Sequence, residues 1–386
     1  MQATANTPDT PIQEQSVFTK RQQRLGKLLA GSGLTSLVLN PGPSLAYLTG
    51  LNFHLMERPV LALFSPAQPV TLVMPELEAA KTASLPFSTQ VLLYGEDPLT
   101  WPAIFKQAAQ IFNLEGQVGV EPTRLRFLEL RLLEQSAPFV SFVSGENLLA
   151  EMRMRKDVDE LARMRQAVAI AQLALKNSLP LARFGMSERE LAAELTLQLL
   201  RAGSDAEMPF SPIVSNGPNS ANPHASPSER TLQPGDLLVI DWGASYQGYC
   251  SDLTRTFAIG DVRAELQIIG QIVLEANQAG REAARPGVPA SLVDAAARNV
   301  IEKAGYGKFF THRTGHGLGM EGHEAPYLRA GNSMVLEPGM TFTVEPGIYL
   351  PGDNGVRIED NVVITENGSE TLSNLPRELI TLGGSS

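Results

Sequence analysis

The sequence predicts two domains, an α/β domain followed by an α+β domain. In the first part of the chain, short apolar stretches typical of strands alternate with stretches of helical periodicity, which predicts an α/β domain. From about residue 150, two pairs of predicted helices each precede a β-rich stretch, an order that indicates an internal duplication. The length of 386 residues agrees with two domains, since one domain averages roughly 150 residues.

The first predicted domain spans residues 17–150. Residues 1–16 are polar and lack the basic-then-apolar order of a signal peptide, so we expect a disordered tail there. A helix predicted over residues 20–30 ends at a pair of glycines, and Asn40-Pro41-Gly42-Pro43 predicts a turn after the first strand. The predicted strands are 36–39, 60–64, 70–74, 90–94, 118–120 and 139–142, and the further predicted helices are 76–84, 101–111 and 123–134.

The second predicted domain, residues 151–386, begins with an amphipathic helix over residues 156–178. Ser187 and Glu190 have the spacing of a capping box, which predicts that a second helix starts here and runs to Leu200. The second pair of predicted helices covers residues 265–284 and 290–304. The stretches after each pair are rich in β-branched and apolar residues, and we expect the sheets there.

Two predicted hairpins in these β-rich stretches each carry a pair of acidic residues. A hairpin centred between residues 246 and 247 would place Asp241 directly opposite Asp252. Another, centred on Gly352, would place Glu345 opposite Glu359. Cβ atoms of opposed residues lie roughly 5 Å apart, and like charges at that distance destabilise a sheet unless something positive lies between them. The two pairs therefore predict a cation site.

Imidazole groups accompany the second acidic pair. Three of the five histidines, His312, His316 and His323, lie within twelve residues, and His316 would add a nitrogen donor to the four carboxylates. Such a set suits two divalent ions, Mn²⁺, Co²⁺ or Zn²⁺, better than a closed structural zinc site. A single acid in a strand is usually a solvated edge charge, but two opposed pairs beside a histidine cluster argue against that interpretation.

Composition excludes several other classes of function. The net charge is 31 − 41 = −10 without a basic stripe, which argues against nucleic acid or an anionic membrane as partner. No apolar run approaches the ~20 residues of a membrane span. Cys250 is the only cysteine, which excludes an intrachain disulfide and fits a reducing compartment. We expect a cytoplasmic enzyme.

Five segments of the second domain together resemble the pita-bread metallopeptidase family, in its Xaa-Pro branch of aminopeptidase P and prolidase. The segments are PIVSNGPNSANPHA (212–225), DWGASYQGYCSDLTRTF (241–257), HRTGHGLGMEGHE (312–324), TVEPGIY (343–349) and GVRIED (355–360). The resemblance implies a creatinase/prolidase-type α/β N-terminal domain and an α+β pita-bread catalytic domain. It also implies a homodimer and, as metal ligands, Asp241, Asp252, His316, Glu345 and Glu359.

The same resemblance implies a mechanism. Two cations, with Mn²⁺ expected first, would lie ~3.5–4 Å apart and lower the pKa of a bridging water. Glu345 would take a proton from that water and pass it to the leaving nitrogen. His224 and His323 resemble the histidines that hold the substrate carbonyl and the tetrahedral intermediate, and His312 would line the proline pocket. Local hydrogen bonding in a glycine-rich loop is the alternative role for these three histidines.

Two arginines are candidates for substrate binding, and substrate length stays open. Arg357 shares a strand face with Glu359 and could hold a carboxylate or compensate charge. Arg329 lies about where some prolidases bind the free carboxylate of the C-terminal proline, which would favour a dipeptidase, whereas an aminopeptidase would leave room beyond the proline. The expected substrates are proline-containing dipeptides or short peptides. A related amidohydrolase acting on a small non-peptide substrate, or a non-catalytic binding protein of the same fold, are the alternatives.

Overall fold

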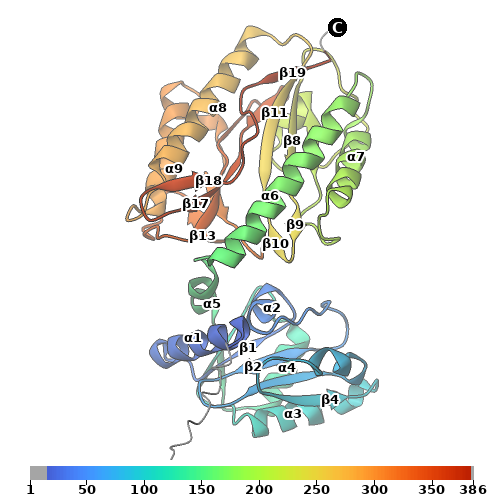
Figure 1. The fold of residues 1–386 in the computed structure, drawn as a ribbon, viewed down its shortest axis with the longest axis vertical. Helices are drawn as coiled ribbons and strands as arrows, with labels where there is room; N and C mark the ends of the chain where they lie inside the picture. Colours follow the sequence, from blue (N-terminus) through green and yellow to red (C-terminus); the bar gives the residue numbers. More distant parts are fainter. Residues whose placement is uncertain (1–14, 384–386) are drawn as a thin grey trace, which may run out of the picture. The chain divides into compact units, whose positions relative to one another are not determined.

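The chain divides into two compact units, one ending at Met152 and one beginning at Arg153 (Figure 1). The computed structural model describes residues 15–383. Of the tail expected at residues 1–16, residues 1–14 lie outside the described residues. Ser16 belongs to the first helix, because its Oγ accepts a hydrogen bond from the Thr19 amide at 3.1 Å and so caps the N-terminus.

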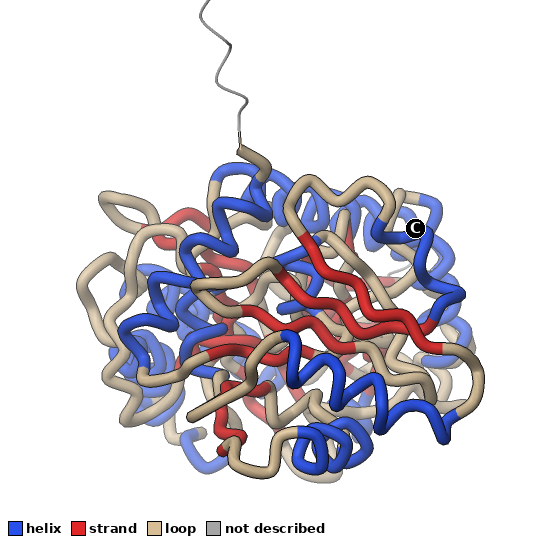
Figure 2. Tube along the Cα trace, turned by 90° about the horizontal axis from the view of Figure 1, so that it is seen from below, coloured by secondary structure: helices blue, strands red, loops and turns tan. Residues whose placement is uncertain are grey.

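The N-terminal unit is built on one six-stranded sheet, with the strand order β4-β3-β2-β1-β5-β6. The strands are β1 (Ser36–Leu39), β2 (Leu61–Phe64), β3 (Val70–Pro75), β4 (Thr89–Tyr94), β5 (Gln117–Val120) and β6 (Ser141–Ser144). The helices are α1 (Val17–Ser32), α2 (Pro43–Thr49), α3 (Trp101–Ile111), α4 (Phe127–Ser136) and α5 (Glu146–Arg153). The predicted α/β architecture is confirmed: β-strands lie side by side with helices around them (Figure 2).

The core of this unit lies between the sheet and the two helices α3 and α4. Val38 and Val118 point to the same face of the sheet and pack with Phe105 of α3 and Leu133 of α4. The strand β2 runs antiparallel to both of its neighbours, β1 and β3, whereas β4 pairs in parallel with β3, and β5 and β6 extend the sheet in parallel from β1. Parallel strands need crossover connections, and α3 and α4 lie in such connections.

Several local expectations for this unit were wrong. The chain bends at residues 41–42 after the first strand, as predicted, but α2 was not expected; it starts at Pro43, which occupies the first helical position, where no backbone N–H is required. The helix predicted over residues 123–134 is Phe127–Ser136, and the one predicted over residues 76–84 is a 3-10 helix, Glu76–Thr82. The last strand, β6, begins at Ser141 rather than at residue 139. Boundaries of short strands and helices depend on packing that a single segment does not encode.

The C-terminal unit contains two pairs of long helices, as predicted. They are α6 (Val158–Ser178), α7 (Glu188–Arg201), α8 (Ala264–Ala283) and α9 (Ala290–Lys303). The capping box is confirmed at α7, where the Ser187 hydroxyl accepts from the Glu190 amide and the Glu190 carboxylate accepts from the Ser187 amide. The first helix of the pair has a second capping box, made by Asp157 and Glu160.

Two main sheets and two short ribbons complete this unit. One sheet has the order β19-β11-β8-β7 and the other β13-β12-β14-β17-β18, while β9 pairs with β10 and β15 with β16. The strands are β7 (Ile213–Asn216), β8 (Leu237–Trp242), β9 (Ser245–Tyr246), β10 (Tyr249–Cys250), β11 (Leu253–Ile259), β12 (Gly315–Gly317), β13 (Glu324–Leu328), β14 (Thr341–Val344), β15 (Gly347–Tyr349), β16 (Gly355–Arg357), β17 (Asp360–Ile364), β18 (Ser369–Thr371) and β19 (Ile380–Leu382).

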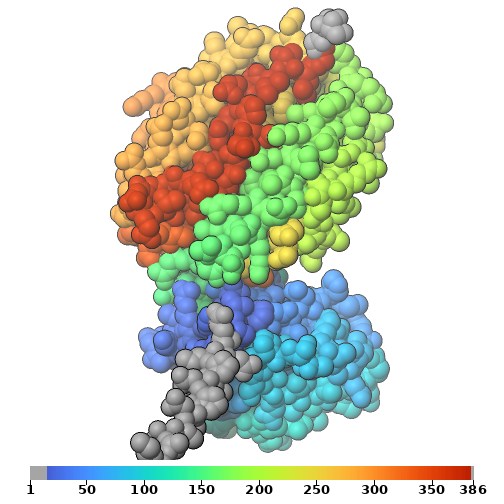
Figure 3. All heavy atoms as spheres, viewed as in Figure 1, coloured from blue at the N-terminus to red at the C-terminus, as the bar shows by residue number. Residues whose placement is uncertain are grey.

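The helices of this unit pack against the faces of the sheets. α6 and α7 pack on β8 and β11 through residues such as Leu195 and Ile240, and the buried Trp242 indole donates to the Ala171 carbonyl of α6 at 2.8 Å. The last described segment, drawn in red, runs between α6 and α8 (Figure 3). Within residues 15–383, no helix combines the length and apolar character needed to cross a bilayer.

Candidate metal centre

The first acidic pair lies on the β8–β11 hairpin, but the two acids are not directly opposed. Asp241 faces Thr254 in the ladder, so the predicted pairing of Asp241 with Asp252 was wrong by two positions. The turn residues are Gln247 and Gly248, with φ of 49° and 78°, and a two-residue turn with positive φ at both positions matches the twist of a hairpin. A shift by two keeps Asp252 on the same face of the hairpin as Asp241.

The second acidic pair has the predicted register. Gly347 pairs with Arg357 in the β15–β16 ribbon, and Val344 pairs with Asp360 in the β14–β17 ladder, so both ladders align Glu345 with Glu359 between them. An isolated bridge joins Glu359 to Thr254 of the first hairpin, and the Thr254 hydroxyl donates to Glu359 Oε2 at 2.6 Å. Thr254 therefore connects the two acidic pairs.

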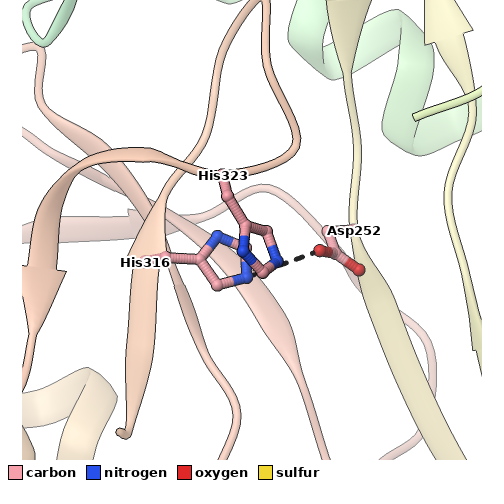
Figure 4. A group of neighbouring side chains, drawn as sticks. All are labelled: Asp252, His316 and His323. Atoms are coloured by element: carbon pink, nitrogen blue, oxygen red, sulfur yellow. Dashed lines mark ion pairs between the residues drawn. The ribbon is translucent and has the colours of Figure 1, made fainter. Parts of the chain in front are cut away.

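The imidazole of His316 faces these acids with a lone pair rather than with a proton. His316 lies on β12, and its Nδ1 is 3.1 Å from the Gly317 carbonyl oxygen. Because a carbonyl oxygen only accepts, Nδ1 carries the proton and Nε2 is unprotonated. Nε2 lies 3.3 Å from Glu345 Oε1. It also lies 3.7 Å from Asp252 Oδ2 (Figure 4). A lone pair that faces two carboxyl groups needs either a proton or a cation between them.

The structure brings all five predicted ligands together. Possible ligand atoms lie within 4.8 Å of one another in three groups: Asp252 with His316 and His323, His316 with Glu345 and Glu359, and Asp241 with Asp252 and Glu359. Among the described residues, the buried Oδ1 atoms of Asp241 and Asp252 have no hydrogen-bond partner. Buried polar atoms are normally paired, and orphaned carboxylate oxygens beside an imidazole lone pair fit a divalent cation.

The electrostatics of the acids agree with this interpretation. Burial raises the pKa of Asp241, Asp252 and Glu359, and the neighbouring carboxylates raise that of Asp252 and Glu359 further. Burial also raises the pKa of Glu345 to about 7. In the absence of a cation these groups hold protons more readily than free carboxyl groups do, so a bound cation would replace protons as it ionises them.

Arg357 compensates part of this negative charge. Its Nη2 donates to Asp241 Oδ2 at 2.6 Å, its Nε to the Thr254 hydroxyl at 3.1 Å, and its Nη1 to the Tyr349 hydroxyl at 2.9 Å. The side chain is buried, and each of its nitrogens has a protein acceptor. These contacts favour charge compensation, one of the two roles expected for Arg357, over a direct contact with substrate.

Tyr349 is a site residue that the sequence analysis missed. Its hydroxyl accepts from Arg357 and lies 2.9 Å from His312 Nε2. His312 Nδ1 lies 2.7 Å from the Arg313 carbonyl and must donate to it, so Nε2 accepts from Tyr349. Burial lowers the pKa of His312 to about 4, which keeps the ring neutral. The register that paired the glutamates also places Tyr349 diagonally from Arg357, and this signal was available in the sequence.

His323, His224 and Arg329, the remaining predicted site residues, differ in how close they lie to the five proposed ligands. The His323 ring stacks on His316 with centroids 3.7 Å apart, and its Nδ1 lies 3.1 Å from Arg313 Nη2. His224 is exposed, and the carbonyl of the preceding residue, Pro223, accepts from Arg357 Nη1 at 3.2 Å. Arg329 is exposed, and in the described part of the chain its guanidinium hydrogen-bonds only the Ala330 carbonyl. The structure thus leaves Arg329 without a contact to the other site residues.

Known proteins are similar to this chain over nearly its whole length. The profile of metallopeptidase family M24 matches residues 162–366, and that of the creatinase/prolidase N-terminal domain matches residues 21–155. The Xaa-Pro dipeptidase of Lactobacillus delbrueckii subsp. lactis is 35% identical over 363 residues, 93% of this chain and 98% of the relative.

Two solved structures have the same fold. The recombinant prolidase from Thermococcus sibiricus matches with a TM-score of 0.89 and 35% identity, covering 95% of this chain and 99% of the other. The X-Pro aminopeptidase from Thermotoga maritima matches with a TM-score of 0.82 and 31% identity, covering 94% of this chain and 99% of the other. The predicted pita-bread architecture is confirmed by these matches.

The raised pKa values predict how the stability of the metal-free protein depends on pH. A carboxyl whose pKa rises on folding, such as Glu345 with a pKa of about 7, stabilises the fold below its unfolded pKa and loses that contribution as pH rises through the folded pKa. We expect the melting temperature of chelator-treated protein to fall between about pH 4.5 and 7. Glu345→Gln should reduce this fall, whereas a fall of equal size in that variant would contradict the assignment to Glu345.

The hydrogen bonds of Tyr349 predict the effect of removing its hydroxyl. Tyr349→Phe leaves the buried Arg357 Nη1 and His312 Nε2 each without one partner, so we expect a loss of about 1–3 kcal/mol in the free energy of unfolding. Urea denaturation of the metal-loaded protein measures it. Tyr246→Phe is the matched control, because that half-exposed hydroxyl meets only Gln247 at 3.4 Å, and it should change stability by less than about 0.5 kcal/mol.

Proposed function

We propose that this chain, which belongs to metallopeptidase family M24, hydrolyses the Xaa-Pro bond of dipeptides or short peptides with two divalent cations. The proposed ligands are Asp241, Asp252, His316, Glu345 and Glu359. The observation that carries the proposal is the position of His316 Nε2, which lies 3.3 Å from Glu345 Oε1 and 3.7 Å from Asp252 Oδ2 while Nδ1 faces the Gly317 carbonyl. The names of the similar proteins support the Xaa-Pro class of substrate.

Two bound cations would supply Lewis-acid activation of the scissile carbonyl and of the water that bridges them. Glu345 is the acid suited to move the proton, because it is less buried than Asp252 or Glu359 and has a pKa of about 7. Its carboxylate would take the proton from the attacking water and deliver it to the proline nitrogen. That nitrogen belongs to a tertiary amide without an N–H, so a peptidase that must recognise an N–H cannot use this bond.

The substrate side of the proposed site consists of three histidines and leaves peptide length open. His312 is neutral and buried beside Tyr349, which suits a wall of the proline pocket. His224 and His323 border the acids on the accessible side and are proposed to hold the substrate carbonyl. Arg329 forms no contact with these groups in the described residues, so the dipeptidase and aminopeptidase activities stay equally open.

Several finer expectations stay predictions. Mn²⁺ is the expected ion, with Co²⁺ and Zn²⁺ as alternatives, because carboxylates outnumber imidazole among the proposed ligands. A homodimer and a cytoplasmic location also stay predictions. The amidohydrolase alternative uses the same ligands on a non-peptide substrate, so only substrate specificity separates it from the peptidase.

The substrate class is tested with a panel of peptides in the presence of Mn²⁺. We expect turnover of Ala-Pro, Ala-Pro-Ala or both, and at least roughly a hundredfold lower kcat/KM for Ala-Ala, which lacks the proline that the site is proposed to enclose. Release of alanine, followed by chromatography, measures the rates. Absence of turnover for both proline peptides, in protein that contains metal, would contradict the peptidase proposal and favour the amidohydrolase.

The ligand assignment is tested by Asp252→Asn. Asp252 lies in two of the three groups of ligand atoms, so the variant should bind fewer than two ions per chain and lose on the order of 10³-fold or more in kcat. Elemental analysis and the peptide assay measure both. Asp353→Asn is the matched control, since this acid lies in the exposed β15–β16 turn and pairs with Arg263. Unchanged metal content in Asp252→Asn would refute the assignment.

A further inference from the structure

We propose that Arg313 is a positioning residue that withholds His323 from the metal ions and fixes it as a hydrogen-bond donor through Nε2. The inference rests on the proposed function, because the donated hydrogen bond is directed to an oxygen of the substrate. His323 has a possible metal-ligating atom within 4.8 Å of those of Asp252 and His316. The five proposed ligands nevertheless do not include His323, and the role of Arg313 explains why.

The proton positions on His323 follow from its contact with Arg313. Arg313 Nη2 lies 3.1 Å from His323 Nδ1, and a guanidinium has donors only. Nδ1 must therefore be the nitrogen with the lone pair, and in a neutral imidazole the proton then resides on Nε2. Both nitrogens are accounted for, so His323 has no lone pair left for a cation, and Nε2–H is available as a donor.

The two stacked imidazoles therefore have opposite proton positions. His316 carries its proton on Nδ1 toward the Gly317 carbonyl and offers Nε2 to the acids, whereas His323 receives Arg313 at Nδ1 and keeps the proton on Nε2. Their rings overlap beside Asp252 (Figure 4), with centroids 3.7 Å apart. The positions of the two rings do not show which of them binds metal. Their hydrogen-bond partners do, because these partners leave a lone pair on Nε2 of His316 and a proton on Nε2 of His323.

Arg313 is itself held in place for this role. Its guanidinium carbon lies 4.6 Å from the centre of the Tyr327 ring, a cation–π contact. Tyr327 pairs with His316 across the β12–β13 ladder, so the arginine is tied to the strand that carries the metal-ligating imidazole. In the part of the chain that the structure describes, no carboxylate forms an ion pair with Arg313. Its main-chain carbonyl also accepts the His312 Nδ1 proton.

Removing the guanidinium should let His323 change its proton position, because a nearby cation favours a lone pair on Nε2. The test compares wild type, Arg313→Met and Arg313→Lys, with Arg285→Met as control, since Arg285 is exposed and bonds only the Glu282 carbonyl. In zinc-loaded protein labelled with ¹⁵N-histidine, we expect an Nε2-protonated His323 in wild type and loss of that signal in Arg313→Met. Arg313→Lys, which keeps a donor, should restore it in part.

A cobalt-loaded sample gives a second readout that does not depend on turnover. If His323 joins the metal ions in Arg313→Met, the visible absorption of bound Co²⁺ should change, and the added substitution His323→Gln should reverse the change, because glutamine offers no imidazole nitrogen. An unchanged ¹⁵N spectrum of His323 in Arg313→Met would overturn the proposal. These spectra decide it even if the wild-type protein hydrolyses no Xaa-Pro peptide.

Kinetics distinguish positioning from direct substrate binding. For Arg313→Met we expect kcat on Ala-Pro to fall roughly a hundredfold to a thousandfold, as for loss of one oxyanion donor, with a smaller change in KM. In a His323→Gln background the same substitution should change kcat by less than about twofold, since the two residues act as one unit. A loss confined to free Ala-Pro and absent for Ala-Pro-amide would instead make Arg313 a carboxylate anchor and overturn the positioning role.

Discussion

Mutual repulsion among four buried or half-buried carboxylates is the constraint on which the catalytic unit depends. Asp241, Asp252, Glu345 and Glu359 come from two hairpins. Burial raises the pKa of each, and neighbouring carboxylates raise the pKa of Asp252, Glu345 and Glu359 further. A fold that holds like charges in this way must supply positive charge or protons at the same point. The hydrogen bond from Thr254 to Glu359 and the contact of Arg357 with Asp241 keep the two hairpins together around it.

The sequence alone predicted which acids and which histidine lie together better than it predicted the geometry that joins them. The register of the second hairpin was correct, because the acids straddle the turn symmetrically around Gly352. The first was wrong by two positions, because the turn forms at Gln247 and Gly248, where positive φ suits a two-residue turn. Asp241 and Asp252 nevertheless lie close together. Strand faces alternate with a period of two, so a shift by two moves an acid along a face without turning it away.

What the sequence could not predict lies in contacts between separate segments. Helix limits in the second unit followed from local signals such as the capping box at Ser187, and the helices were found nearly as expected. Proton positions on His312, His316 and His323 depend instead on single carbonyl and guanidinium partners, which become known only when side chains are placed. The role of Arg329 stays a prediction, because it was carried over by alignment across a loop and the structure leaves this side chain exposed.

Asp360, the residue after Glu359, shows that a buried acid in this fold can be paired with arginines. Asp360 is fully buried, yet it contacts Arg255, Arg281 and Arg377. Burial would raise its pKa, but Arg255 and Arg377 hold it at about 2. The chain can therefore neutralise a buried acid with arginines. Among the described residues, one arginine, Arg357, forms an ion pair with one of the four site acids, Asp241. The formal charge of these four carboxylates and the arginine is 1 − 4 = −3. One divalent ion would leave that cluster negative, and two would bring it to 4 − 3 = +1. This charge balance is a reason, independent of sequence likeness, to expect at least one divalent ion at the four acids.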